Sequence, residues 1–404
     1  MVVGLGLVSL TVDMVADGAR SISGPLLAQL GASALAVGAI TGATEAAGFT
    51  LRLVSGPLAD RTRRYWDFTF IGYALTALSV PLLAITPTLG VAGLSVAAAL
   101  LFTERVGKAI RSPAKTVLLA DAAGAVGRGR GFGVHKTLDQ VGAFLGPLVV
   151  AGVIALTGVM WPAFLVLIIP AAIAMLLLVR LRRRVPDPSA YARAPEAARS
   201  NQVEARSTVT ANTRGGLHVT FMLFAVSFAL STFGMVGFGV ISFHLADSGI
   251  VELSVIPLIF ALGMLAAAVS ALVNGWAYDR IGASVMLVVP VLVACIPALA
   301  LSTVVPAAVA GVVVWGAAVG IQDSTVKALV ADLAPSGRRG TAYGVFAVLQ
   351  GATTFASATL AGALYHDRAL LTGIIAAAQL CSLVLLITVI RRRRRLETPK
   401  APSE

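Results

Sequence analysis

Apolar residues dominate the chain in long runs that short polar segments separate. Each run is about 20 residues long, the length at which a helix crosses the ~30 Å hydrocarbon core of a bilayer. Because backbone groups in lipid must be paired within their own segment, every run is expected to be a helix. Twelve spans are predicted, near residues 3–28, 35–58, 67–87, 90–112, 132–157, 161–181, 217–242, 252–277, 283–303, 306–330, 341–363 and 369–390.

The composition supports a membrane protein. Of the 404 residues, 57% are hydrophobic and 12% are charged, whereas soluble domains contain about 25% charged residues. The fold class expected is therefore an all-α membrane protein, with the lipid bilayer as its solvent.

Basic residues indicate the orientation of the spans. The net charge of +12 alone would suggest a nucleic-acid partner, but 25 of the 31 Lys and Arg residues lie in segments that should share one side of the membrane. The loops of the opposite side hold only Arg368. The positive-inside rule then predicts a multi-pass protein of the plasma (inner) membrane with both termini in the cytoplasm. The run from Arg391 to Arg395 is interpreted as an anchor at anionic lipid, and no nucleic acid is expected as a partner.

One long polar segment divides the spans six and six. Residues 182–216 are rich in Pro, Ala, Arg and Ser and have little to bury, which is typical of a flexible cytoplasmic linker. The expected domains are an N-terminal six-helix bundle (1–181), this linker, a C-terminal six-helix bundle (217–390) and a basic cytoplasmic tail (391–404). The protein is expected to be a monomer.

Three sequence patterns recur at equivalent places in the two halves. The segment from Gly56 to Arg61 ends the second span, and the similar segment from Gly275 to Arg280 ends the eighth. Arg-Gly-x-x-x-Gly opens the fifth span at residues 128–133 and the eleventh at 339–344, and Asp121 and Asp332 precede these openings by the same distance. The repetition indicates duplicated six-helix halves.

These motifs resemble those of the major facilitator superfamily, in particular its drug:proton antiporters. The gating motif of that family matches Gly56, Asp60, Arg61 and Arg64, with an echo at Gly275, Asp279 and Arg280; the usual second glycine is missing, and Thr62-Arg63-Arg64 stands there instead. Its antiporter motif resembles Gly142, Gly146 and Pro147. The resemblance implies two pseudo-symmetric six-helix bundles that work by alternating access.

The gating motif has a physical interpretation as a latch. Asp60 can face the positive N-terminal end of a neighbouring helix, while Arg61 and Arg64 supply donors at the cytoplasmic rim. If Asp60 docks only in the outward-open state, the latch biases alternating access. Ordinary anchoring of the loop by its positive charge is the alternative.

Ionisable residues inside the spans are costly and need partners or a wet cavity. The acids proposed for proton coupling are Asp13, Asp17, Glu45, Glu104 and Asp139. They face five bases in the same half, Arg20, Arg52, Arg105, Lys108 and Lys136. Either these groups are structural ion pairs, or at least one carboxylate titrates and carries the coupling proton. The residues proposed to bind substrate are Arg20, Arg52, Arg105, Lys108, Gln140, Phe233, Trp315, Gln322, Asp323 and Gln350.

The leading hypothesis is a secondary active transporter that exports small organic or amphipathic compounds by proton antiport. The alternatives are proton-coupled or facilitative uptake of a small organic anion, and a non-transporting membrane sensor or assembly factor. An enzyme is not expected, because the four histidines are scattered and no Walker, dinucleotide or zinc motif occurs. Neither a cofactor nor a metal is expected; the expected partners are protons and a small-molecule substrate.

Overall fold

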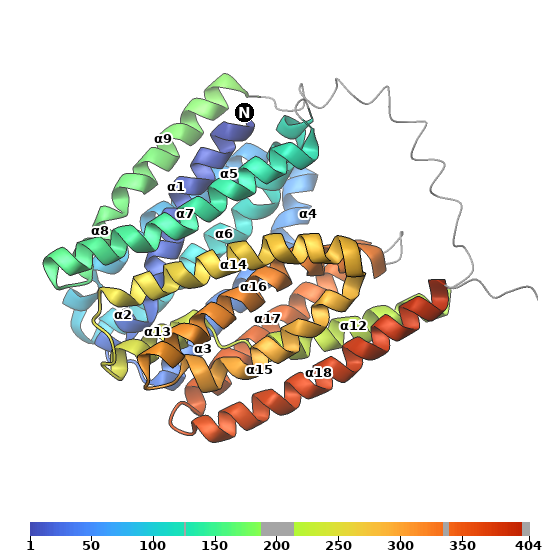
Figure 1. The fold of residues 1–404 in the computed structure, drawn as a ribbon. Coiled ribbons are helices and arrows are strands. Elements are labelled where there is room, and N and C mark those ends of the chain that lie inside the picture. Colours follow the sequence, from blue (N-terminus) through green and yellow to red (C-terminus); the bar gives the residue numbers. More distant parts are fainter. Residues whose placement is uncertain (125–126, 187–213, 334–338, 398–404) are drawn as a thin grey trace, which may run out of the picture.

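The computed structural model describes residues 1–124, 127–186, 214–333 and 339–397, and every regular element in these ranges is a helix (Figure 1). The first half contains α1 (Val2–Ser21), α2 (Ser23–Gln29), α3 (Ala34–Thr50), α4 (Arg52–Thr62), α5 (Tyr65–Leu82), η1 (Leu83–Ala92), α6 (Gly93–Ala123), α7 (Arg128–Thr157), α8 (Trp161–Val166) and α9 (Ile168–Arg184). The second half contains α12 (Arg214–Phe233), α13 (Phe238–Asp247), α14 (Val255–Ile281), η4 (Gly282–Leu287), α15 (Val288–Ala300), α16 (Val305–Leu333), α17 (Arg339–Ala363) and α18 (Arg368–Glu397).

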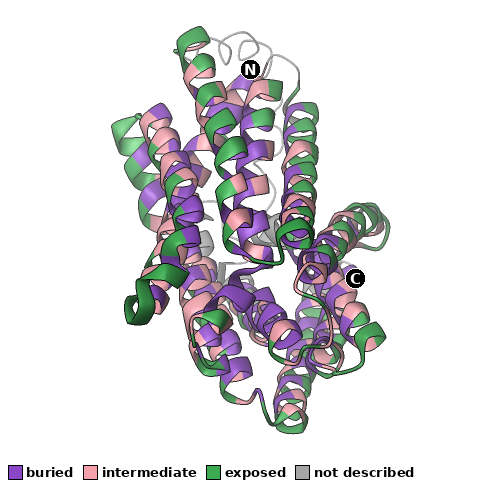
Figure 2. Ribbon diagram, turned by 90° about the vertical axis from the view of Figure 1, so that its left-hand side faces the viewer, coloured by how far each residue is buried: buried purple, intermediate pink, exposed green. Residues whose placement is uncertain are grey.

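The helices agree with the predicted spans. Eleven helical stretches in the described residues are long and apolar enough to cross a membrane, and one of them, Tyr65–Ala123, has 59 residues and contains two predicted spans joined by η1. Large apolar side chains such as Leu78, Ile169 and Leu272 are exposed on the outside of the bundle, and buried positions face inward (Figure 2). The side of the bundle where α1 begins and α18 ends is called the terminal side below, and the other is called the far side.

The segments between and after the halves are only partly described. Most of the predicted linker, residues 187–213, lies outside the described residues, and α9 extends the first half to Arg184. The predicted tail begins inside a helix, since α18 continues through the arginine run to Glu397. Arginine is a good helix former, so a helix can continue beyond the apolar run.

The first span is broken at Ile22, between α1 and α2. Ile22 has φ −120° and ψ 13°, outside the helical range. Pro25 has no N–H, and its ring would clash with the carbonyl of residue 21 in a continuous helix. The break turns α2 toward the second half.

The fourth span differs most from its prediction, because α6 continues to Ala123 instead of ending near residue 112. Pro113 lies inside α6 and removes the N–H that would pair with the carbonyl of Ala109. The hydroxyl of Ser55 donates to that carbonyl instead, at 2.8 Å. A side chain of a neighbouring helix thus satisfies the acceptor that the proline leaves free, and the helix continues.

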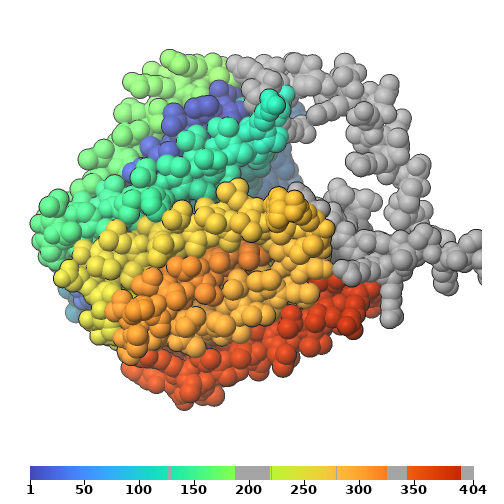
Figure 3. Space-filling model, in the orientation of Figure 1, coloured from blue at the N-terminus to red at the C-terminus, as the bar shows by residue number. Residues whose placement is uncertain are grey.

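The two halves have the same internal arrangement. In the first half α1 packs against α7 and α9, and α5 against α6; in the second half α12 packs against α17 and α18, and α15 against α16. The halves meet where α3 packs against α17 and where α7 packs against α14. These two pairs are equivalent, because each joins the second span of one half to the fifth span of the other. Figure 3 shows α7 and α14 side by side on one face.

The halves are also packed closely at the far side, where α2 contacts α13. A Cβ atom at Gly24 would overlap the backbone of Gly239 and Phe243, so only glycine permits this approach. Phe243 and Tyr365 of the second half share an apolar core with Leu26 and Leu27 of the first. The far side is therefore closed in this conformation.

Candidate functional site

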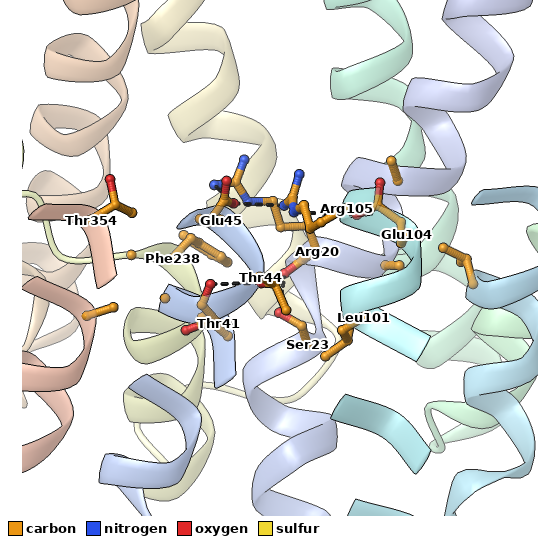
Figure 4. Close-up of a pocket in the computed structure, with 17 residues that line it drawn as sticks. Arg20, Ser23, Thr41, Thr44, Glu45, Leu101, Glu104, Arg105, Phe238 and Thr354 are labelled. Carbon is orange, nitrogen blue, oxygen red and sulfur yellow. Dashed lines mark hydrogen bonds and ion pairs between the residues drawn. The ribbon is translucent and has the colours of Figure 1, made fainter. Parts of the chain in front are cut away.

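A cavity lies between the halves at the middle of the bundle (Figure 4). It encloses about 610 Å³ of space, part of it open to solvent. Its lining residues are Ala16, Ala19, Arg20, Ser23, Thr41, Gly42, Thr44, Glu45, Val80, Leu101, Glu104, Arg105, Gly237, Phe238, Gly239, Thr354 and Ala358. All the charged groups come from the first half, and the second half supplies small residues, Thr354 and the ring of Phe238.

Four charged residues, which we call the cavity quartet, form one connected group. Glu45 Oε1 lies 2.9 Å from Arg20 Nη2 and 2.8 Å from Arg105 Nη2. Arg105 Nε lies 3.4 Å from Glu104 Oε2. The two acids and two bases balance, so the cavity can hold charge without a net excess. The sequence-predicted residues Arg20, Glu45, Glu104 and Arg105 are thus brought together.

Two polar atoms, one in the quartet and one on the neighbouring Arg52, have no hydrogen-bond partner among the described residues. They are Glu104 Oε1 and Arg52 Nε, both buried. The Arg52 guanidinium lies over the Phe49 ring, 5.6 Å from its centroid. Unpaired buried polar atoms are costly, so these two atoms are positioned to bind a solute or water.

A second ionic group lies nearer the terminal side. Lys115 Nζ is 3.7 Å from Asp139 Oδ1 and 2.9 Å from Ser9 Oγ, and Ser9 donates a hydrogen bond to Asp139. Arg111 Nη2 is 3.9 Å from Asp13 Oδ1. We call Ser9, Asp13, Arg111, Lys115 and Asp139 the Asp13–Asp139 cluster.

The carboxyl groups of Asp13 on α1 and Asp139 on α7 lie close enough to act on each other. Two ionised carboxylates have only acceptors and repel each other, so a hydrogen bond between them would require one of them to carry a proton. Asp139 also faces Lys115 and accepts from Ser9, both of which favour its ionised form. Asp13 is then the partner that can hold the proton.

The glycines of the predicted antiporter motif set the distance between these two helices. A Cβ atom at Gly142 would overlap the carbonyl of Leu10, and one at Gly146 would overlap the carbonyl of Met14. Close packing of α7 on α1 brings Asp139 to Asp13. Pro147, the third residue of the motif, lies inside α7 without ending it.

The gating motif lies on the surface of the terminal side. Asp60, Arg61 and Arg64 are exposed. The Tyr65 hydroxyl donates to Asp60 Oδ1 at 3.2 Å, and Arg64 Nε pairs with Asp67 Oδ2 at 2.7 Å. Asp60 therefore binds within its own half in this conformation.

The glycines of the gating motif and of its second copy are loosely packed. A Cβ atom at Gly56 would touch only Pro113, at 3.8 Å, and at Gly275 it would meet nothing within 4 Å. In the second copy the Arg280 guanidinium lies 3.7 Å from the centroid of the Trp276 ring. The side chain of Asp279 lies outside the described residues.

The remaining predicted residues lie around the cavity, outside its lining. Asp17 is buried on α1 between the two ionic groups, with no ion pair to another described residue. Lys108 acts electrostatically on both Asp13 and Glu45. Trp315 is buried behind Phe238, with ring centroids 5.5 Å apart. Lys136 pairs with Asp139 at 3.7 Å. Gln322 is buried and Asp323 is exposed. The other three predicted residues are half-buried: Gln140, Phe233 and Gln350.

Sequence reasoning missed several contributors. Lys115 was assigned to a loop because α6 was expected to end near residue 112, and Arg111 was counted with the same loop. Phe238 was missed because nothing in the sequence marks the break between α12 and α13 as the cavity wall. The hydroxyl of Ser9 offered no signal, since serine is common in membrane helices. Among the described residues, no three His, Cys, Asp or Glu side chains are grouped as a metal site would require.

Comparison with known proteins places the chain in a family. Residues 6–358 match the model of the Major Facilitator Superfamily, and residues 222–404 match it again. An uncharacterized protein of Mycobacterium tuberculosis and one of Mycobacterium bovis are each 46% identical to the chain over 387 residues, covering 95% of this chain and 91% of each relative. An uncharacterized MFS-type transporter of Methanocaldococcus jannaschii is 24% identical over 371 residues, which cover 89% of this chain and 87% of that protein.

Solved transporter structures share the fold. A peptide transporter POT in complex with sulfate superposes with a TM-score of 0.70 at 17% identity, covering 98% of this chain and 94% of that one. The inward-open xylose transporter XylE from E. coli gives 0.68 at 13% identity, covering 100% and 98%. The nucleoside transporter NupG gives 0.69 at 13% identity, covering 97% and 99%. With its duplicated helical halves and the cavity between them, the chain belongs to the Major Facilitator Superfamily and is a multi-pass membrane transporter.

Proposed function

We propose that this protein is a proton-coupled carrier that exports small organic or amphipathic compounds from the cytoplasm in exchange for protons. The observation that carries the proposal is the proximity of two carboxyl groups, that of the buried Asp13 and that of the half-buried Asp139, a pair that is stabilised when one of the two binds a proton. Both groups lie on helices of the first half, and α1 connects them to the cavity.

The face of α1 supplies the route of coupling. Asp13, Asp17 and Arg20 are four and three residues apart, so they follow one face of the helix. Asp13 belongs to the proton-holding pair and Arg20 to the cavity quartet. Loss of the proton from Asp13 changes the charge beside Asp17 and the quartet, which alters how the cavity holds a solute.

Alternating access fits the packing of the halves. The basic residues gather at the terminal side, which supports a cytoplasmic location for that side and for both termini. The conformation described here is closed at the far side, and Asp60 does not engage the other half. We assign it to the inward-facing state, and the outward-facing state arises when the halves rock about the cavity.

The decisive experiment measures uphill transport in proteoliposomes with an imposed pH gradient, using a panel of amphipathic cations and organic anions as solutes. In Asp13→Asn the amide can still donate to Asp139, so the fold is retained while the proton site is lost. We expect this variant to lose uphill transport and to keep downhill exchange. Uphill transport by Asp13→Asn at the wild-type rate would refute the proposed proton site.

Asp17→Asn tests the role of the Asp17 carboxylate separately from that of Asp13. We expect it to abolish proton-driven transport and to leave the folded protein intact. If it transports uphill as the wild type does, Asp17 has no part in coupling. Asp67→Asn, which removes a carboxylate from the surface pair with Arg64, is the control and should transport normally.

A second candidate function is uptake of a small organic anion. It is favoured by Arg52, whose buried Nε has no partner among the described residues, and by the neighbouring Arg20, Arg105 and Lys108. The direction of proton flux distinguishes the two functions. An exporter acidifies the compartment that the solute leaves, whereas a proton symporter acidifies the compartment that the solute enters.

A further inference from the structure

A hydrogen-bond network on the far side joins His244, Tyr365, Asp247 and Ser302. The His244 side chain is fully buried, with Nδ1 3.0 Å from the Tyr365 hydroxyl and Nε2 3.1 Å from the carbonyl oxygen of Ser302. The same Tyr365 hydroxyl lies 3.0 Å from Asp247 Oδ2, to which it donates. Tyr365 therefore bridges an imidazole and a carboxylate.

The network contains three contacts, and each contact needs one proton between its two heavy atoms. The Ser302 carbonyl and an ionised Asp247 carboxylate can only accept. The Tyr365 hydroxyl supplies one proton and a neutral His244 supplies another, which leaves one contact without a donor. One additional proton satisfies all three contacts: both nitrogens of His244 then donate, to Ser302 and to Tyr365, and Tyr365 donates to Asp247.

Tyr365 keeps its own proton. Burial raises the pKa of Tyr365, and the bond to Asp247 raises it further. The additional proton can then sit on the His244 imidazole or on the Asp247 carboxylate, and we assign it to the imidazole because that group is intrinsically the more basic of the two. Asp247 is exposed at the end of α13, so the bridge from Asp247 through Tyr365 connects the far-side solution to the buried His244.

The charged groups around the network partly oppose each other. Burial opposes a positive charge on His244, and so does Arg368 at the start of α18, whereas the bond to the Ser302 carbonyl and the charge of Asp247 favour it. His366 packs its ring edge-on to Tyr365 at 5.0 Å, and Asp367 Oδ1 accepts from the backbone N–H of Leu370.

The helices packed on α13 add few charges. α2 has no ionisable residue, and Glu252 precedes α14. Arg20 of α1 and Glu45 of α3 are paired with each other, and the ionisable residues of α14 and α17 lie at their terminal-side ends.

We propose that this network is a proton-binding site on the far side, in which an imidazolium at His244 and a carboxylate at Asp247 share the Tyr365 hydroxyl. Its position gives the bound proton a structural effect. His244 and Asp247 belong to α13, the helix that closes on α2, and Phe243 and Tyr365 pack against Leu26 and Leu27. The proton holds α13 to the end of α17 and to the turn before α16, so it stabilises the closed far side. The site is separate from the Asp13–Asp139 cluster and does not depend on it.

Nuclear magnetic resonance of ¹⁵N-histidine-labelled protein in lipid nanodiscs tests this directly. The signal of His244 is assigned by its loss in His244→Gln. At about pH 6, near the range where histidine titrates, we expect the wild-type His244 to have both nitrogens protonated. In Asp247→Asn the amide donates to the Tyr365 oxygen, Tyr365 donates to Nδ1 and neutral His244 donates to Ser302, so we expect a neutral ring at the same pH.

Two further variants complete the test. Tyr365→Phe breaks the bridge without touching either charged residue, and we expect a neutral His244 there as well. Asp367→Asn removes a neighbouring carboxylate outside the network and should give the wild-type signal. A wild-type His244 that stays neutral down to about pH 5, or one that is doubly protonated in Asp247→Asn at about pH 6, would overturn the proposal.

Discussion

One carboxylate oxygen of Glu45 holds two arginines, Arg20 at 2.9 Å and Arg105 at 2.8 Å. These contacts join α1, α3 and α6 at the level of the cavity. The arrangement ties the position of three helices to the charge on a single side chain, and it makes Glu45 the residue whose neutralisation has the most direct effect on the cavity.

Glu45→Gln should lower the stability of the folded protein. It leaves two cations close together, and breaking a fully buried pair costs ~3–5 kcal/mol. Because the Glu45 side chain is 25% exposed, we expect a smaller loss of about 2 kcal/mol, measured by thermal unfolding in detergent. Asp67→Asn is the matched control, since Asp67 is similarly exposed at 29% and also contacts two arginines. Its partners Arg64 and Arg182 are 70% and 48% exposed, whereas the Glu45 partners Arg20 and Arg105 are only 28% and 12% exposed. The loss in Asp67→Asn should stay below about 1 kcal/mol; equal losses in the two variants would contradict the buried role of Glu45.

Ser55→Ala should destabilise α6 through the carbonyl of Ala109. Pro113 has no N–H to donate to that carbonyl, which accepts from the Ser55 hydroxyl instead. An unsatisfied buried acceptor costs about 1–3 kcal/mol. Pro113→Ala restores an N–H at position 113, so the double variant should recover most of the stability lost by Ser55→Ala. A double-mutant cycle of unfolding free energies measures this coupling; strictly additive effects would show that the two sites are independent.

Alanine at Gly142 or Gly146 should separate α7 from α1. The added Cβ would overlap the backbone of Leu10 or Met14, so we expect lower stability and loss of proton-coupled transport as Asp139 moves away from Asp13. Gly152→Ala is the control in the same helix, because nothing lies within 4 Å of a Cβ there. It should be neutral or stabilising by up to ~1 kcal/mol, the usual preference of helices for alanine. Comparable losses at all three positions would show that helix packing is not the cause.

Arg63→Gly should stabilise the turn between α4 and α5. Arg63 ends α4 with φ 54° and ψ 18°, a left-handed conformation that costs an L-residue about 1–2 kcal/mol. Glycine adopts it without this strain, so the unfolding temperature should rise, while Arg63→Val should lower it. A lower unfolding temperature for Arg63→Gly would show that the Arg63 side chain contributes more than its backbone strain costs.

Asp60→Asn tests the latch in the conformation that is not described here. Asp60 is exposed and bonds only Tyr65 among the described residues, so the stability of the present conformation should change by less than about 0.5 kcal/mol, as for other surface sites. If Asp60 docks on the other half in the outward-facing state, the variant shifts the population toward the inward-facing state. Distances between spin labels on α4 and α17 report that shift; an unchanged distribution would leave Asp60 as a loop anchor.

The helical architecture could be predicted from the sequence because lipid restricts the options. An apolar run of sufficient length must form a helix that pairs its own backbone, and repeated motifs such as Gly56–Arg61 and Gly275–Arg280 revealed the duplication. The four ionisable residues of the cavity quartet were also predicted, because charges inside spans are rare enough to stand out.

The pairing of these charges could not be predicted. Helical spacing assigns a residue to a face of its own helix but not to a partner on another, so the contact of Asp13 with Asp139 depends on how closely Gly142 allows α7 to approach α1. The predicted span ends near residue 112, whereas α6 continues past Pro113. The hydroxyl that replaces the missing donor belongs to Ser55, which lies 54 residues from Ala109 in sequence, so no local pattern reveals it. The network of His244 was invisible for the same reason, since Tyr365 and Ser302 are distant in sequence.

The ion pairs that join two described side chains all lie within residues 1–184. These ion pairs and the second half's share of the cavity lining, which includes Phe238 and Thr354, are therefore encoded in separate stretches of the chain. A second half recombined from a relative would replace Phe238, Thr354 and the surfaces around them without breaking a single one of these pairs. Such chimeras would keep the charged groups of the first half and change part of the cavity lining, so that the contribution of each half to transport could be measured separately.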